Sequence, residues 1–107
     1  MKKIRTGIAS FGLSGRVFHA PFIHANEAFE LVSICERSGN QAKQIYPDVN
    51  IVRTFDELIA DATLDLVIVN TPDTTHYDYC RAALEANKHV LVEKPFVFTV
   101  AEGEALI

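Results

Sequence analysis

Short hydrophobic runs rich in Val and Ile alternate along the chain with segments whose apolar residues recur every three or four positions. Such runs are typical of strands buried on both faces, and the longer spacing is typical of helices packed on one side. The alternation predicts an α/β fold, a three-layer doubly wound parallel sheet with right-handed crossovers and strand order 3-2-1-4-5. The expected strands are Ile4–Ser10, Phe29–Cys35, Ile51–Val52, Leu66–Asn70 and His89–Glu93.

Residues with strong positional preferences mark the helix ends. Thr54 and Thr99 each stand three residues before a glutamate, the capping-box pattern that begins a helix. The clearest helix runs from about Thr75 to Ala86, and Asn87 is expected to end it in the left-handed conformation. The first helix, from about Leu13, should be broken or kinked by Pro21.

Composition narrows the class of protein further. The 107 residues are 49% hydrophobic and carry 10 Lys and Arg against 14 Asp and Glu, which predicts one globular domain. The net charge of −4, with no basic cluster, argues against nucleic acid or a membrane surface as partner. No apolar run approaches the roughly 20 residues of a membrane span, so a cytoplasmic protein is expected. Cys35 and Cys80 are expected to be free buried thiols.

The end of the chain leads to an expectation about its length. Ile107 comes about two helical turns after Thr99, with no residue that would end a helix. We therefore expect a chain truncated before a sixth strand. The apolar row Val90–Val92 would then be an exposed sheet edge, which favours self-association into a homo-oligomer.

The first predicted strand leads into a degenerate phosphate-binding motif. Ser10-Phe11-Gly12-Leu13-Ser14-Gly15 is GxGxxG with serine in the first glycine position. In the dinucleotide fingerprint the glycines permit a tight turn, close approach of a pyrophosphate and close packing of the helix. Ser10 can make this turn only if its φ is negative. A plain strand-to-helix turn remains the alternative.

Other chemistries fit the same segments poorly. A P-loop would need lysine where Leu13 stands, and a GxSxG nucleophile elbow would need glycine where Arg16 stands. His76 and Cys80 lie one helical turn apart, but no further metal ligands have matching spacing. We therefore expect no metal site.

Glu36 follows the second strand, 21 residues after Gly15, where an acid can accept hydrogen bonds from the adenosine ribose and disfavour a 2′-phosphate. Arg37 argues the other way, since a guanidinium can pair with that phosphate. The pair therefore leaves NAD and NADP both open as the cofactor. A solvated turn is the alternative for both residues.

The fourth strand ends in Asn70-Thr71-Pro72, at the point where the predicted strand order reverses and ligands bind in open α/β sheets. These polar groups therefore suggest a ligand site. The alternative is an ordinary turn and helix cap.

The fifth strand runs into Glu93-Lys94-Pro95, and with it the chain resembles the Gfo/Idh/MocA oxidoreductases, the glucose–fructose oxidoreductase and inositol dehydrogenase family. Three segments carry this resemblance, in the family's order and spacing: GIASFGLSGRVFHAPF at 7–22, NTPDTTH at 70–76 and KHVLVEKP at 88–95. The resemblance implies that residues 1–107 are an N-terminal NAD(P)-binding Rossmann domain. It also implies a C-terminal α/β substrate domain, which these residues do not include.

The resemblance implies roles for particular residues. The cofactor-binding set would be Ser10, Phe11, Gly12, Leu13, Ser14, Gly15, Glu36, Arg37, Asn70, Thr71, Pro72, His76, Glu93 and Lys94. Lys94 would also be catalytic, because an ammonium beside the nicotinamide stabilises the oxygen charge that develops during hydride transfer.

The expected function is therefore the cofactor domain of an NAD(P)-dependent oxidoreductase of sugar-like or cyclitol-like secondary alcohols. The family's acid–base residues come from the second domain, so the 107 residues alone should not turn over. A dinucleotide-sensing or scaffolding module without catalysis is the alternative, and a purely structural domain is the third. Lys94 separates the first two, because a sensor needs no charge beside the nicotinamide.

Overall fold

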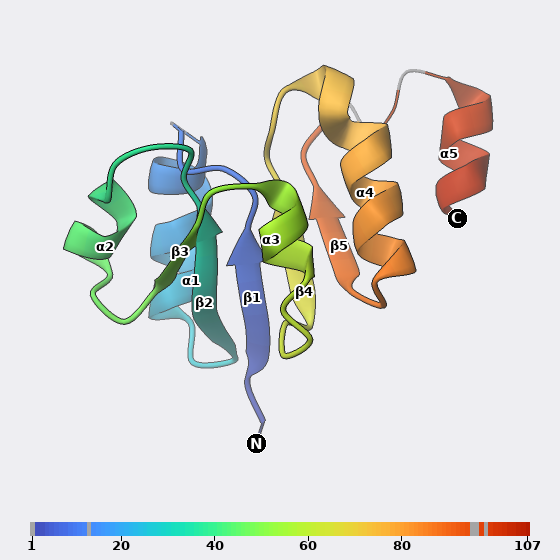
Figure 1. Cartoon of the computed structure of the whole chain (residues 1–107). Helices are drawn as coiled ribbons and strands as arrows, with labels where there is room; N and C mark the ends of the chain where they lie inside the picture. The colour runs from blue at the N-terminus through green and yellow to red at the C-terminus, as the bar shows by residue number, and fades with distance from the viewer. Residues whose placement is uncertain (1, 13, 95–96, 98) are drawn as a thin grey trace.

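The computed structural model describes residues 2–12, 14–94, 97 and 99–107. Its five parallel strands form one sheet in the order β3-β2-β1-β4-β5, which confirms the predicted topology (Figure 1). The strands are β1 (Ile4–Ile8), β2 (Phe29–Cys35), β3 (Asn50–Val52), β4 (Leu66–Val69) and β5 (His89–Val92). Their carboxyl ends therefore meet at one edge of the sheet.

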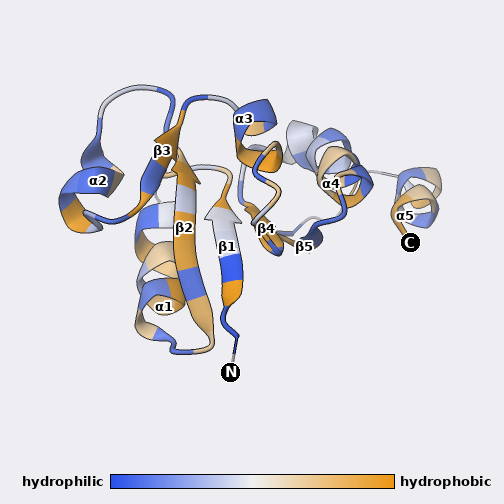
Figure 2. Cartoon of the chain, turned by 60° about the horizontal axis from the view of Figure 1, so that its bottom comes forward, coloured by the Kyte–Doolittle hydropathy of each residue, from blue (hydrophilic) through white to orange (hydrophobic). Residues whose placement is uncertain are grey.

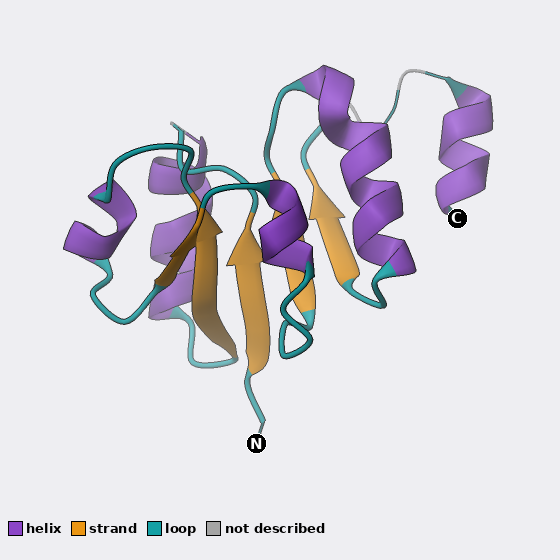
Figure 3. Cartoon of the chain, viewed as in Figure 1, coloured by secondary structure: helices purple, strands orange, loops and turns teal. Residues whose placement is uncertain are grey.

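Helices cover both faces of this sheet (Figure 3). The short helical segments are η1 (Gly15–His19), α1 (Ala20–Ala25), α2 (Gln41–Ile45), α3 (Phe55–Ile59) and η2 (Asp73–Thr75). The two longer helices are α4 (His76–Glu85) and α5 (Val100–Leu106). The clearest predicted helix thus begins one residue later than expected, after the 3-10 turn η2.

The alternation of side chains along each strand builds two hydrophobic clusters. On one face Ile8, Ile34 and Ile68 pack against α1 and α2, and on the other Val67 and Val69 pack against α3 and α4. Figure 2 colours most of β4 as hydrophobic, as expected for a strand covered on both sides. Both faces are thus buried by helices, as in the predicted three-layer arrangement.

The predicted helix ends are confirmed. The Thr54 hydroxyl accepts a hydrogen bond from the Glu57 N–H at 3.2 Å, and Thr99 accepts one from the Glu102 N–H at 3.1 Å. Asn87 is the one non-glycine residue with positive φ, 62°, in the described ranges. It ends α4 in a Schellman motif, since its N–H and that of Lys88 donate to the carbonyls of Leu84 and Ala83.

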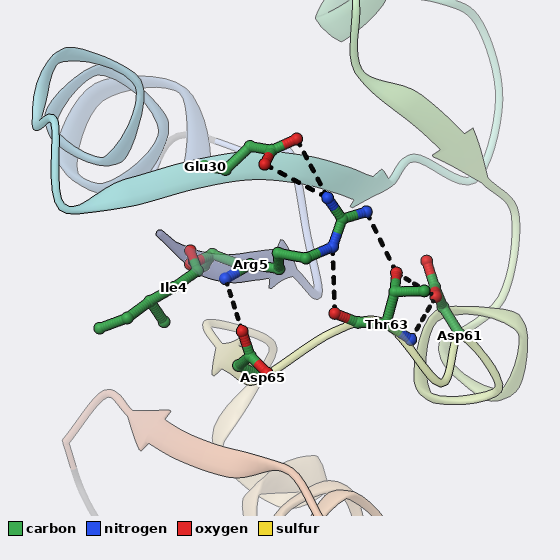
Figure 4. A network of polar contacts seen from close by, with 7 residues as sticks. Ile4, Arg5, Glu30, Asp61, Thr63 and Asp65 are labelled. Atoms are coloured by element: carbon green, nitrogen blue, oxygen red, sulfur yellow. Dashed lines mark hydrogen bonds and ion pairs between the residues drawn. The ribbon is translucent and has the colours of Figure 1, made fainter. Parts of the chain in front are cut away.

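The amino end of the sheet is held by a polar network around Arg5 (Figure 4). The Arg5 guanidinium donates to Glu30 on β2 and to the carbonyl and hydroxyl oxygens of Thr63. The Asp61 carboxylate accepts from the N–H and the hydroxyl of Thr63, at 2.8 and 2.6 Å. The ammonium group of Lys88, although buried, donates a hydrogen bond to the Asp61 carbonyl. The loop before β4 is thus fixed by charge-assisted bonds.

Asp61 should make folding stability depend on pH. The Thr63 side-chain and backbone hydrogen bonds hold the pKa of Asp61 below its ordinary value. A lowered folded-state pKa gives stability that is present above the unfolded pKa and is lost as the pH falls through the folded one. We expect Asp61→Asn to lower the free energy of unfolding by about 1–2 kcal/mol at pH 7.

This difference between Asp61→Asn and the wild type, measured by urea unfolding, should shrink as the pH falls below about 4. Asp48→Asn serves as the control, because no side-chain hydrogen bond to Asp48 is found in the described ranges and its removal should leave stability unchanged. A difference that is the same at pH 7 and at pH 3 would contradict this reading of Asp61.

Three further predictions concern the two cysteines, the edge of the sheet and membrane spans. Cys35 and Cys80 are free and buried as expected, and burial raises the pKa of both thiols. β5 is an edge strand, and its Leu91 is 45% exposed. Self-association through this edge stays a prediction.

None of the helices in the described ranges combines the length and hydrophobicity that a bilayer-spanning helix requires.

Candidate functional site

A cleft of about 760 Å³ lies where the strands end, at the carboxyl edge of the sheet. Seven of the predicted site residues line it: Ser10, Phe11, Gly12, Glu36, Arg37, Thr71 and Pro72. The cleft is also lined by nine residues that the sequence did not predict for the site: Ala9, Cys35, Ser38, Arg53, Thr54, Phe55, Thr74, Thr75 and Tyr79. The ends of β1, β2 and β4 thus face one common space, as expected at a topological switch point.

The turn after β1 is closely packed on one side and open on the other. A Cβ added to Gly15 would lie 2.2 Å from the Ser10 carbonyl oxygen, so only glycine lets η1 begin this close to the strand. A Cβ on Gly12 would meet only the Ser10 hydroxyl, at 3.6 Å, and Gly12 is exposed. The backbone at Gly12 can therefore be approached closely by a pyrophosphate, so this turn fits a dinucleotide.

Ser10 makes this turn without backbone strain, because it is not among the residues with positive φ. Its hydroxyl accepts a hydrogen bond from the Gly12 N–H at 3.3 Å. The serine thus closes the turn with its side chain, since Ser and Thr hydroxyls often bond to the backbone two residues further along the chain. The condition that the sequence set for Ser10, a negative φ, is met.

Asn70, at the end of β4, ties the sheet to this turn. Its side-chain N–H donates to the Ser10 carbonyl at 2.8 Å and to the Ser14 hydroxyl at 3.3 Å. The carbonyl acceptor fixes the orientation of the amide, and the Asn70 Oδ1 atom is left buried with no hydrogen-bond partner among the described residues. Asn70 is only 7% exposed, so it holds the turn in place from the interior of the protein.

Glu36, at the end of β2, has a partner that the sequence did not predict. Its two carboxylate oxygens accept from the N–H groups of Gln41 and Ala42, each at 3.2 Å. These are the first N–H groups of α2, which the Asn40 side chain leaves uncapped. Glu36 therefore acts as the cap of α2, and part of its acceptor capacity is used within the protein.

Arg53, just after β3, brings a second guanidinium to this end of the cleft. It donates to the carbonyls of Glu36 and Gly39, at 3.1 and 2.6 Å, and to the Asn40 side chain at 3.1 Å. These bonds hold the loop after β2. In the described ranges no ion pair joins either Arg37 or Arg53 to a carboxylate. This end of the cleft therefore carries two guanidiniums that form no ion pair in the described ranges, beside the Glu36 carboxylate.

The loop after β4 is ordered by its own side chains. The Thr71 and Thr75 hydroxyls share a short hydrogen bond, and Thr75 also donates to the Pro72 carbonyl at 2.6 Å. The His76 ring lies within hydrogen-bond distance of the Thr71 carbonyl, at 3.0 Å, and is 1% exposed. Thr71 and Pro72 therefore line the cleft, while His76 supports the loop from inside.

Two stacked rings form an apolar part of the cleft wall. Phe55 on α3 and Tyr79 on α4 lie with ring centroids 4.0 Å apart and planes at 4°. Both line the cleft. The sequence does not predict that these two rings line the site, because nothing local shows that α3 and α4 bring them together beside the strand ends.

The last predicted segment lies after β5. The Glu93 carboxylate pairs with the His19 ring on η1, and Lys94 is exposed. The structure therefore brings Glu93 to the helix that follows the glycine turn, a contact that the sequence analysis did not predict. Leu13 and Pro95 lie outside the described residues. Within the described ranges no three His, Cys, Asp or Glu residues gather as a metal site.

Comparisons with known proteins show the family of this chain. The model of an oxidoreductase family with an NAD-binding Rossmann fold, GFO_IDH_MocA, matches residues 4–107. The scyllo-inositol 2-dehydrogenase (NADP+) of Bacillus subtilis is 38% identical over 96% of this chain and 29% of its own length.

Solved structures of oxidoreductases share the fold of this chain. A Bacteroides fragilis protein described as an oxidoreductase superposes with a TM-score of 0.96 and 56% identity, covering 98% of this chain and 33% of that one. The NADP complex of KijD10, a 3-ketoreductase from Actinomadura kijaniata, gives a TM-score of 0.90 at 27% identity, with 98% and 33% covered. The chain thus spans about a third of the length of its relatives.

Proposed function

We propose, because this chain belongs to the Gfo/Idh/MocA family of NAD(P)-binding oxidoreductases, that it is the cofactor domain of a dehydrogenase of sugar-like or cyclitol-like secondary alcohols. The observation that carries the proposal is the turn at Gly12 and Gly15, closed against the sheet on one side and open to the cleft on the other. The named activity of the B. subtilis relative, on a cyclitol, supports the substrate class.

In this proposal the cofactor lies along the carboxyl edge of the sheet. The turn at Ser10, Gly12 and Gly15 would hold its pyrophosphate, and Asn70 keeps that turn in place. Glu36 and Arg37 would hold its adenosine end, and Thr71 and Pro72 its nicotinamide end. The Glu93-Lys94 corner, the two residues that follow β5, is not among the residues lining the cleft, and the family resemblance assigns it to the nicotinamide end. The bound cofactor supplies the hydride donor or acceptor. The chain's own contribution is to bind and orient it.

Lys94 has the catalytic role in this proposal. Its exposed ammonium, one residue beyond the Glu93 carboxylate, would stabilise negative charge on the substrate oxygen during hydride transfer. The substrate and the acid–base residues would come from a C-terminal domain in the two-thirds of the relatives that this chain does not span. The 107 residues would then bind cofactor without turning over.

NADP is the cofactor that the charges at the adenosine end favour. The Glu36 carboxylate, which would repel a 2′-phosphate, is engaged by two N–H groups of α2. Arg37 and Arg53 line the same part of the cleft and have no carboxylate partner in the described ranges. A phosphate dianion there would meet two guanidiniums and the Ser38 hydroxyl.

The proposal is tested by thermal unfolding of the purified chain with and without cofactor. NADPH at a hundred times its dissociation constant should add about 2.7 kcal/mol of stability, which corresponds to a rise in Tm of roughly 10–20 °C in a domain of this size. NADH at the same concentration should give a smaller rise. Inorganic phosphate is the control ligand, and no rise with either dinucleotide would contradict the proposed function.

A further inference from the structure

The helix after the glycine turn begins with a π-helical segment, and Pro21 explains why. Proline has no N–H, and its ring collides with the carbonyl four residues earlier, here that of Val17. The wider turn of η1 relieves this collision, because the Ala20 N–H donates to the carbonyl of Gly15, five residues back. Since each helical residue turns the chain by about 100°, the extra residue changes the direction in which side chain 19 leaves the helix.

His19, the last residue of η1, meets a carboxylate 74 residues away. Its Nε2 atom lies 2.6 Å from the Glu93 Oε1 atom, a short distance for such a pair. The side chains of His19 and Glu93 are 17% and 33% exposed, respectively. The two other ion pairs of the described ranges are Arg5–Glu30, at the amino end of the sheet, and Arg81–Glu85, along α4.

The His19–Glu93 pair joins two parts of the proposed cofactor site. His19 follows Gly15 by four residues, so it is carried by the segment whose start is packed against Ser10. Glu93 follows β5 and donates its own N–H to the Val69 carbonyl at 3.2 Å, which fixes its backbone to β4. The pair therefore spans from the glycine turn to the corner that carries Lys94. The Asn70 hydrogen bond to Ser10 links β4 to the same turn.

We propose that His19 is a positioning residue for the nicotinamide end of the site: through the Glu93 carboxylate it sets the Glu93-Lys94 corner relative to the glycine turn. The inference rests on the proposed function, since it assigns that corner to the nicotinamide. Its physical basis is that a partly buried, charge-assisted bond holds two segments in one relative position. Among the described residues, the remaining hydrogen bonds that link the corner to this turn run through β4 and Asn70.

The test compares a whole dinucleotide with its adenosine half. Calorimetry gives the dissociation constants of NADPH and of 2′,5′-ADP, which lacks the nicotinamide, and of NADH and ADP as a parallel pair. His19→Leu should weaken NADPH binding about tenfold, the factor expected when one hydrogen bond to a charged group is lost. Binding of 2′,5′-ADP should change less than twofold.

Two further variants separate positioning from general stability. His19→Gln keeps a side-chain N–H donor and should recover most of the NADPH affinity, and it also covers the case in which His19→Leu does not fold. His24→Gln is the matched control, because His24 lies one turn further along α1 and packs against Tyr46, away from Glu93.

The results distinguish the two proposals. Equal weakening of NADPH and 2′,5′-ADP by His19→Leu, or no weakening of either, would overturn the positioning role. A wild-type chain that binds neither dinucleotide nor adenosine half would instead contradict the proposed function. If His19→Gln weakens NADPH binding as much as His19→Leu does, the hydrogen bond to Glu93 is not what sets the corner.

Discussion

Replacing Gly15 with alanine should abolish dinucleotide binding and destabilise the fold. The new Cβ would lie 2.2 Å from the Ser10 carbonyl oxygen and 3.1 Å from the Asn70 amide nitrogen. The first of these atoms belongs to the backbone, so it cannot turn aside as a flexible side chain can. The turn must open instead, which breaks the Asn70–Ser10 hydrogen bond and moves η1 away from β1. We expect a loss of about 3 kcal/mol in the free energy of unfolding, the upper part of the range for overpacking.

The matched control is Gly12→Ala, at the other glycine of the same turn. There the added Cβ meets only the Ser10 hydroxyl at 3.6 Å, an ordinary contact, so stability should change by less than about 1 kcal/mol. A methyl group on this exposed face stands where the pyrophosphate would approach, so NADPH affinity should still fall. Urea unfolding and calorimetry with NADPH separate the two effects.

These two variants test whether the two glycines have different tasks. Gly15→Ala should fail in stability and in binding, and Gly12→Ala in binding alone. A Gly15→Ala chain with wild-type stability would show that the turn is not held against β1 as described. A Gly12→Ala chain that binds NADPH as tightly as the wild type would place the pyrophosphate elsewhere.

Much of the fold follows from local signals in the sequence. The strand order, the caps at Thr54 and Thr99 and the left-handed Asn87 depend on hydrophobic period and on the preferences of single residues, and all are confirmed. The glycine turn is predictable for the same reason, because its chemistry is contained in six consecutive residues. Pro21 predicted a disturbance of the first helix, and the disturbance is the π-helical segment η1.

The parts of the site that were missed depend on distant residues and on side-chain direction. Arg53 reaches the loop after β2 because β3 pairs with β2, which places residue 53 beside residues 36–40. The Glu36 carboxylate accepts a hydrogen bond from the start of α2. The sequence does not show whether this carboxylate would bind the helix or a ligand. His19 meets Glu93 only because η1 begins beside β1 and β5 ends on the far side of β4. No periodicity or spacing carries these contacts.

The other large effect concerns the choice between the two dinucleotides, and we expect it to depend on Arg37 and Arg53. Each guanidinium that pairs with a 2′-phosphate contributes about 1.5–3 kcal/mol, the range for hydrogen bonds to charged groups. The double variant Arg37→Gln and Arg53→Gln should therefore reduce the preference for NADPH over NADH by about a hundredfold or more. NADH affinity itself should change little, because NADH has no phosphate at this position.

The single variants separate direct contact from support of the loop. Arg53 already makes three hydrogen bonds to residues 36–40, so Arg53→Gln should also loosen that loop and weaken both dinucleotides slightly. Arg37 has no hydrogen bond or ion pair in the described ranges, so Arg37→Gln should affect NADPH alone. Arg81→Gln removes one positive charge on α4, where Arg81 pairs with Glu85, and serves as the control for net charge.

Ionic strength gives an independent measurement of the same contact. A phosphate held by two guanidiniums is partly screened by salt, so the preference of the wild type for NADPH should fall as salt rises from about 0.05 to 0.5 M. The double variant should show almost no such dependence. A wild-type preference that survives in the double variant, with its salt dependence intact, would assign the phosphate to other groups and leave Arg53 only the role of holding the loop after β2.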